Sequence, residues 1–195
     1  MHQLWQVPHL PTPCLLIKTL AIQVRGIINK EGVLSTTTFP YDRRPNDHLV
    51  LSSFNPTTGT IAHPEAILTI KVDTVPTPSS QFTQNKTSHR PHYDAARVRA
   101  GIIDRKAKKE VLLFNEAGEV TECSITNVYF WRNGQWVTPK KESGCLPGVA
   151  RRWMLENGRA VEGTVRKEEV QDGELVLLSN GLYIAQLGRV DLSPV

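Results

Sequence analysis

The 195-residue sequence is poor in cysteine, in long apolar runs and in charge of one sign. Its three cysteines, Cys14, Cys123 and Cys145, are too few and too far apart for a disulfide framework or a paired zinc knuckle, so we expect a reducing compartment. The apolar stretch near the start is interrupted by Lys18 and is too short to span a bilayer. The sequence therefore predicts a cytoplasmic protein with no membrane partner.

The basic residues give little support for a nucleic-acid partner. The formal net charge is +4, and the densest basic stretch, residues 97–109, lacks the aromatic platforms and the reader motif that such a surface needs. We interpret this stretch as the polar positions of a solvated helix, compatible with a small anionic ligand. His89 and His92 form an HxxH pair without a third ligand at a suitable spacing, so no metal site is predicted.

The first eighty residues are rich in proline and threonine and favour strands. Residues 66–72 alternate between apolar and polar side chains, which is typical of a half-buried strand. Residues 24–39 predict a hairpin with its turn at NKEG, and residues 49–54 predict a further strand. The composition changes at residues 74–80, which we interpret as a linker.

The second half alternates between helix and strand signals and predicts an α+β fold. Asn133-Gly134 predicts a tight hairpin turn, and a helix over residues 146–157 is expected to end at Gly158. Pro91 suits the first turn of another helix. The apolar face of that helix is expected to comprise Tyr93, Ala96, Ala100 and Ile103. Apolar strand segments complete this half, namely residues 111–115, 120–131, 135–139, 174–180 and 181–188.

Three features of this half could take part in binding or catalysis. Glu122 lies inside an apolar strand, where a carboxylate is costly unless a cation or a strong donor faces it; taken alone, an edge strand with Glu122 in water is the simpler interpretation. Pro147 and Gly148 precede a helix start whose backbone N–H groups favour an anion. Lys86 precedes the first helix and is by itself typical of a solvated surface. Together, however, a lysine, a carboxylate and an anion-binding helix start are what pyridoxal phosphate requires.

The segment ECSITNVY, followed by WVTP and by SGCLPGVAR, resembles the signature of class IV aminotransferases, the fold-type IV pyridoxal phosphate family. That family includes branched-chain and D-amino acid aminotransferases and aminodeoxychorismate lyase. The resemblance extends from about Leu68 to Val190, and NKTSHRPHYDAAR with SNGL looks most like lyase members of fungal type. It implies a two-domain fold like that of D-amino acid aminotransferase. A partial β-rich N-terminal domain with its linker would occupy residues 1–80, and the C-terminal cofactor-binding α/β domain residues 81–195.

The resemblance also implies roles for individual residues. Lys86 matches the catalytic lysine that bonds to the cofactor, and Glu122 the carboxylate that keeps the pyridine nitrogen protonated. Tyr93 is not assigned to the cofactor site, because its spacing from Lys86 differs from that of the tyrosine in branched-chain enzymes. The other cofactor-binding positions implied are the signature asparagine Asn127, Val149 and Ala150 at the helix start, and Asn180 with Gly181 in the loop opposite.

The function implied is that of a pyridoxal phosphate-dependent lyase in folate biosynthesis, acting on a small-molecule amine as a homodimer. It would convert 4-amino-4-deoxychorismate to 4-aminobenzoate and pyruvate. A class IV aminotransferase for a branched-chain, D-amino acid or amine substrate would need the same residues and stays open. Two departures from the family pattern are Ala150, where many relatives carry threonine, and a chain that begins later than theirs, with a shortened N-terminal domain. A non-catalytic truncated remnant is therefore the third interpretation.

Overall fold

The structure is a computed structural model that describes residues 22–40, 53–104 and 107–194. The chain forms two compact units, residues 1–43 and residues 44–195, and each is described by itself.

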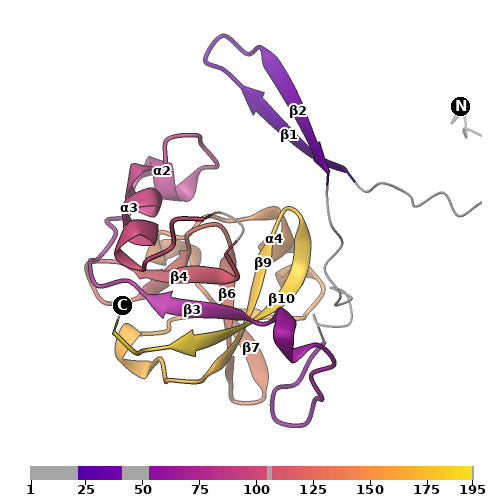
Figure 1. The fold of residues 1–195 in the computed structure, drawn as a ribbon, viewed down its shortest axis with the longest axis vertical. Helices are drawn as coiled ribbons and strands as arrows, with labels where there is room; N and C mark the ends of the chain where they lie inside the picture. The colour runs from indigo at the N-terminus through magenta and orange to yellow at the C-terminus, as the bar shows by residue number, and fades with distance from the viewer. Residues whose placement is uncertain (1–21, 41–52, 105–106, 195) are drawn as a thin grey trace, which may run out of the picture. The chain divides into compact units, whose positions relative to one another are not determined.

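The first unit contains an antiparallel hairpin, β1 (Ile22–Ile28) with β2 (Leu34–Pro40) (Figure 1). The Asn29 side chain accepts a hydrogen bond from the Val33 N–H at 2.8 Å, and Gly32 has a φ of 80°. An Asn that bonds its own turn and a glycine with positive φ are the residues that such a reversal needs. The predicted hairpin and its turn are confirmed.

The second unit is built on one mixed sheet of eight strands in the order β5-β4-β3-β10-β9-β6-β7-β8. Strand β3 runs parallel to both of its neighbours and β7 runs parallel to β8, whereas the other pairs are antiparallel. With its few helices, the unit has the predicted α+β architecture. The strands are β3 (Leu68–Val72), β4 (Lys109–Phe114), β5 (Val120–Cys123), β6 (Asn127–Arg132), β7 (Gln135–Pro139), β8 (Val161–Gly163), β9 (Leu175–Asn180) and β10 (Tyr183–Asp191).

The sheet curls until its two ends meet. The Val120 N–H, at the start of β5, donates to the Val165 carbonyl at 2.8 Å, and the Lys167 N–H donates to the Gly118 carbonyl at 2.9 Å. This curl encloses an apolar core to which β3, β4, β6 and β9 contribute. Its fully buried members include Ile70, Leu112, Phe130, Val176 and Leu178.

Helices pack on the outside of the curl (Figure 1). Helix α3 covers β4, where Val111 and Leu113 point toward it while Leu112 points into the core. Helix α4 packs against β9 and β10 through Met154. The α-helices are α2 (Gln81–Gln84), α3 (Pro91–Arg99) and α4 (Val149–Glu156), and the short 3-10 turns are η1 (Pro64–Ala66), η2 (Lys141–Ser143) and η3 (Lys167–Glu169).

Two predicted turns are confirmed by their backbone conformation. Asn133 and Gly134 have φ values of 51° and 81°, as a tight hairpin between β6 and β7 requires. Gly158 follows α4 with a φ of 62°, the left-handed conformation expected of a residue that ends a helix. The predicted strand at 49–54 lies outside the described residues except for its last two positions, which are not in a strand.

Three expectations about exposure are wrong. Lys71 is buried, although the alternating pattern put it in water, because β3 is a central strand; its ammonium lies 2.9 Å from Asp191. Ile103 is 93% exposed, since α3 ends at Arg99 and the chain turns away. Arg97 is buried beside a carboxylate and α3 ends at Arg99, so the described part of residues 97–109 is not a solvated helix.

The linker expected at residues 74–80 contains no helix or strand. Strand β3 precedes it yet belongs to the same sheet as the strands that follow, and the chain divides into its two compact units between residues 43 and 44. The two-domain boundary at residue 80 stays a prediction.

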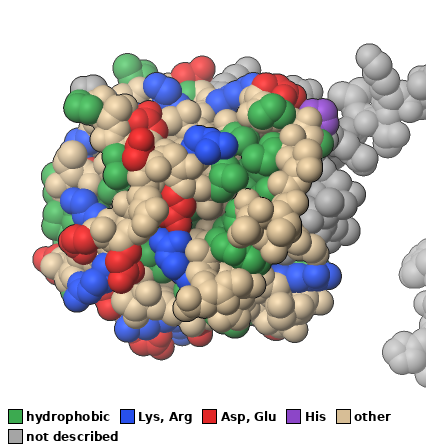
Figure 2. All heavy atoms as spheres, turned by 90° about the horizontal axis from the view of Figure 1, so that it is seen from below, with side chains coloured by type: hydrophobic (Ala, Val, Ile, Leu, Met, Phe, Trp, Pro, Cys, Tyr) green, Lys and Arg blue, Asp and Glu red, His purple; other side chains and the backbone are tan. Residues whose placement is uncertain are grey.

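Acidic and basic side chains are interspersed on the face that Figure 2 shows. Within the described residues, no helix is long and apolar enough to cross a bilayer.

Candidate active site

A cavity of about 400 Å³ opens in the second unit, within the size range of small-ligand sites. Four separate segments form its wall: residues 82–93, 122–127, 146–149 and 179–181. The curled sheet and the start of α4 bring these segments together. Six of the seven predicted site residues line the cavity, namely Lys86, Glu122, Asn127, Val149, Asn180 and Gly181.

Glu122 is 4% exposed, although β5 ends the strand order of the sheet. The simpler interpretation, an edge carboxylate in water, is wrong because the curl covers β5. The Tyr93 hydroxyl donates a hydrogen bond to Glu122 Oε1 at 2.6 Å, which is the strong donor that a buried carboxylate needs. Tyr93 thus belongs to the site through Glu122. Its place on the buried face of α3 was visible in the sequence, but its partner was not.

Burial raises the pKa of Glu122 from its ordinary value of 4.5 to about 7. The Tyr93 hydroxyl and the backbone of Leu146 act in the opposite direction, and so do the positive charges of Lys86 and Arg90. Desolvation dominates these effects. The carboxyl group is therefore poised to ionise near neutral pH, and a cationic ligand group in the cavity would favour its ionised form.

Lys86 lies in the loop between α2 and α3, where it is exposed and lines the cavity. The preceding turn is held by Ser80, whose hydroxyl accepts from the Phe82 N–H at 3.2 Å while Thr83 Oγ1 accepts from the Ser80 N–H at 3.0 Å. This reciprocal capping arrangement fixes the start of α2, and the Asn85 N–H donates to the Gln81 carbonyl at the end of the helix, just before Lys86. Lys86 and Glu122 reach the same cavity from a loop and from a strand.

The start of α4 forms another part of the wall. No side chain caps it: Gly148 is extended, with a ψ of 153°, and its carbonyl accepts the first helical hydrogen bond, from the Arg152 N–H. The first N–H groups of a helix have no partner within the helix, so those of Val149 and Ala150 are suited to an anion. Ala150 is buried and is not among the residues that line the cavity, so its predicted role at the phosphate stays a prediction.

Asn127 fixes this helix start in place. Its Nδ2 donates to the Leu146 carbonyl at 2.7 Å, and a Cβ atom added at Gly148 would lie 2.4 Å from its Oδ1. Because real Cβ contacts essentially never fall below 3 Å, a side chain at position 148 would force the Asn127 amide to move. The described contacts therefore show Asn127 orienting the turn that precedes α4.

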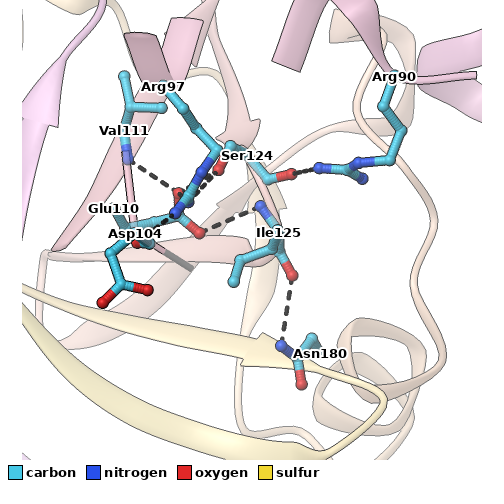
Figure 3. Close-up of polar contacts among 8 residues, drawn as sticks. All are labelled: Arg90, Arg97, Asp104, Glu110, Val111, Ser124, Ile125 and Asn180. Atoms are coloured by element: carbon cyan, nitrogen blue, oxygen red, sulfur yellow. Dashed lines mark hydrogen bonds and ion pairs between the residues drawn. The ribbon is translucent and has the colours of Figure 1, made fainter. Parts of the chain in front are cut away.

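A second turn, Ser124–Ile125, connects the opposite parts of the wall (Figure 3). The Ile125 carbonyl accepts from Asn180 Nδ2 at 3.3 Å, and the Ser124 carbonyl accepts from Arg90 Nη2 at 2.6 Å. The Asn180 Oδ1 in turn accepts from the Leu182 N–H at 2.8 Å. Asn180 is thereby held between the Ser124–Ile125 turn and its own β9–β10 turn, and Arg90, which the sequence did not single out, is held in the loop that carries Lys86.

The two histidines of the HxxH pair pack against aromatic rings. The His89 ring lies 4.3 Å from Phe82 and the His92 ring 4.0 Å from Tyr93, measured between ring centroids. Over the described ranges, no three metal-ligating side chains lie together.

The family model for amino-transferase class IV matches residues 27–186. The chain belongs to the class IV aminotransferase family. It is 41% identical over 113 residues to a Schizosaccharomyces pombe protein named as a candidate aminodeoxychorismate lyase, a match covering 56% of this chain and 48% of that protein. It is 35% identical over 136 residues to the Saccharomyces cerevisiae aminodeoxychorismate lyase, covering 62% of this chain and 36% of that enzyme. The chain thus spans less than half the length of each of these relatives.

Among solved structures, a candidate amino-acid aminotransferase from Mesorhizobium loti superposes with a TM-score of 0.67 at 25% identity, covering 87% of this chain and 72% of that one. A branched-chain aminotransferase candidate from Thermotoga maritima superposes with a TM-score of 0.60 at 19% identity, covering 89% of this chain and 61% of that one, and shows the fold. The predicted family and its α+β fold are confirmed.

Proposed function

We propose that this chain provides the cofactor site of a pyridoxal phosphate-dependent lyase that converts 4-amino-4-deoxychorismate to 4-aminobenzoate and pyruvate. The observation that carries the proposal is the meeting of Lys86, the buried Glu122 and the uncapped start of α4 in one cavity. The names of the two yeast relatives favour the lyase over an aminotransferase.

The residues present fit pyridoxal phosphate by charge and by space. The N–H groups of Val149 and Ala150 would hold its phosphate, with Gly148 allowing close approach to the main chain. Asn180 and Gly181 line the same cavity from the β9–β10 turn and would complete this phosphate site. When bound, the cofactor supplies a ring that withdraws electrons from the amine-bearing carbon of the substrate.

Glu122 would hold a proton at the ring nitrogen of that cofactor. The Tyr93 hydroxyl, at 2.6 Å, orients the carboxylate and remains its donor. A pyridine nitrogen next to an anionic Glu122 keeps its proton, since an opposite charge favours the protonated form. Burial raises the pKa of the Glu122 carboxyl to about 7, so this ionic pair would also offset the burial of Glu122.

Lys86 Nζ would take the proton from the amine-bearing carbon of the substrate. A positioned general base of this kind contributes about 10² to 10⁴ in rate. Loss of that proton lets the bond between the ring and the enolpyruvyl oxygen break, so the ring becomes aromatic. The released enolpyruvate takes up a proton on its methylene carbon and leaves as pyruvate, which balances the reaction without a second substrate.

The decisive experiment uses the full chain supplied with pyridoxal phosphate and with aminodeoxychorismate made in situ, following 4-aminobenzoate and pyruvate by chromatography. K86A should abolish both product formation and the borohydride-reducible attachment of the cofactor. K30A is the matched control, because Lys30 lies exposed in the hairpin of the first unit, and it should change neither.

Other results would contradict the proposal in distinct ways. Transamination of D-alanine, L-leucine or R-phenylethylamine without 4-aminobenzoate would make the chain an aminotransferase. Neither product from a cofactor-loaded protein would make it a non-catalytic remnant. A cofactor adduct that persists in K86A would show that Lys86 is not the residue that bonds to the cofactor.

A further inference from the structure

Arg90 occupies a distinctive place in the cavity wall. It is the residue just before α3, half-buried, between Lys86 and Tyr93 along the chain. Its Nη2 donates to the Ser124 carbonyl at 2.6 Å, and its guanidinium carbon lies 4.7 Å from the centroid of the Tyr93 ring. A hydrogen bond at one end and an aromatic face beneath leave the planar group little freedom to turn.

The turn that supports Arg90 is itself held from behind (Figure 3). Glu110, 1% exposed, accepts hydrogen bonds from the Ser124 hydroxyl and from the Ile125 N–H, the latter at 3.1 Å. Arg97 donates to Ser124 Oγ at 3.1 Å and lies 3.5 Å from Glu110. Because this network is buried, the Ser124 carbonyl presents a fixed acceptor, and Arg90 keeps one orientation in the cavity.

Among the described residues, Arg90 differs from the other buried and half-buried arginines because it has no carboxylate partner. The guanidinium groups of Arg97, Arg99, Arg132 and Arg151 each form an ion pair with a carboxylate. Within the described ranges Arg90 forms none, and its one side-chain hydrogen bond goes to a neutral carbonyl. Of its five N–H groups, the others are available in a fork that matches a carboxylate.

The segment of the wall that carries Arg90 is not the one that carries the start of α4. Gly148 and Val149 belong to the segment 146–149, whereas Arg90 lies in the same loop as Lys86. The charged residues that line the cavity are Lys86, Arg90 and Glu122, and Glu122 is already engaged by Tyr93. A carboxylate brought near Lys86 would therefore meet Arg90 as its cationic partner.

We propose that Arg90 binds a carboxylate of the substrate and so selects an anionic amine for this site. This inference rests on the proposed function, whose substrate carries two carboxylates. Arg90 is a binding residue: it holds the substrate with its amine-bearing carbon toward Lys86, and it takes no proton.

The test compares two probes of nearly equal size, 4-hydroxybenzoate with its carboxylate and 4-hydroxybenzamide with a neutral amide, titrated by calorimetry into the full chain loaded with pyridoxal phosphate. The unsubstituted protein should bind the acid at least tenfold more tightly than the amide. R90Q, which keeps a donor for the Ser124 carbonyl but no charge, should lose at least tenfold in affinity for the acid and less than twofold for the amide. R90K should recover part of the loss, and R189Q, another arginine bonded to a backbone carbonyl but exposed, should change neither.

Steady-state kinetics provide the second readout. R90Q should raise KM for aminodeoxychorismate at least tenfold, leave kcat within about threefold and keep the bound-cofactor absorbance. Equal affinity of the unsubstituted protein for acid and amide overturns the proposal, whether or not R90Q folds. Turnover of aminodeoxychorismate with an unchanged KM in R90Q overturns it while the lyase function stands. Absence of turnover together with an acid preference that R90Q abolishes refutes the lyase function and leaves the carboxylate site in place.

Discussion

Replacing Glu122 with glutamine should make the cofactor-free protein more stable at alkaline pH and have little effect at acidic pH. The carboxyl group is buried and its pKa is raised to about 7, so the folded protein retains a proton that the unfolded chain loses near pH 4.5. Where the folded state binds more protons than the unfolded state, the free energy of unfolding decreases as pH rises. Glu122 therefore lowers stability progressively from about pH 4.5 to about pH 7.

The size of this effect follows from the two pKa values. The difference between about 7 and 4.5, at about 1.4 kcal/mol per pKa unit, corresponds to about 3 kcal/mol of lost stability above pH 7. Because 4% of Glu122 is exposed, solvent screening reduces this figure little. Glutamine retains an oxygen that accepts from the Tyr93 hydroxyl and cannot ionise, so the stability gain of E122Q over the unsubstituted protein should grow by about 3 kcal/mol between pH 4.5 and pH 8.

Urea unfolding of both proteins at half-unit pH steps, without cofactor, measures this difference directly. Y93F is the companion variant: it removes the donor that favours the ionised carboxylate, so the pH range of the stability loss should move above 7. E116Q, at an exposed turn position, is the control and should change stability by less than about 0.5 kcal/mol. A stability difference between E122Q and the unsubstituted protein that stays constant with pH would refute the assignment of a buried, titrating Glu122.

Further predictions concern the helix start, the buried ion pair and the hairpin. G148A should weaken cofactor binding at least tenfold in a fluorescence titration, because the added Cβ would lie 2.4 Å from Asn127 Oδ1; unchanged binding would remove the helix start from the site. R97M should cost about 3–5 kcal/mol in urea unfolding by leaving Glu110 buried without its cation, and R97M/E110Q should cost less than R97M alone. The hairpin at residues 22–40 exposes several large apolar side chains, so we expect the chain to self-associate in light scattering, whereas a monomer at every concentration would contradict this.

Local sequence determined several elements without help from the rest of the chain. Asn133-Gly134 specifies its hairpin turn because these residue types tolerate the two positive φ values that the turn needs. Gly158 ends α4 for the same reason. The order of motifs from Glu122 to the start of α4 was also sufficient to identify the family, since the spacing of such motifs is a property of the chain itself.

The burial of Glu122 was decided by tertiary structure alone. Glu122 lies on β5, the last strand in the order of the sheet, and an edge strand is normally exposed to water. Glu122 is buried because the sheet curls and Val120 bonds to Val165, which lies 45 positions later in the sequence. The hydrogen bond of Asn127 to the Leu146 carbonyl and that of Arg90 to Ser124 have the same origin. Periodicity and turn propensity describe conformation over a few neighbouring residues. Solvent exposure and hydrogen-bond partners depend on which distant segments the folded sheet brings into contact. The sequence was therefore sufficient to identify the lysine and the carboxylate as candidates, whereas the fold determined that they share one cavity.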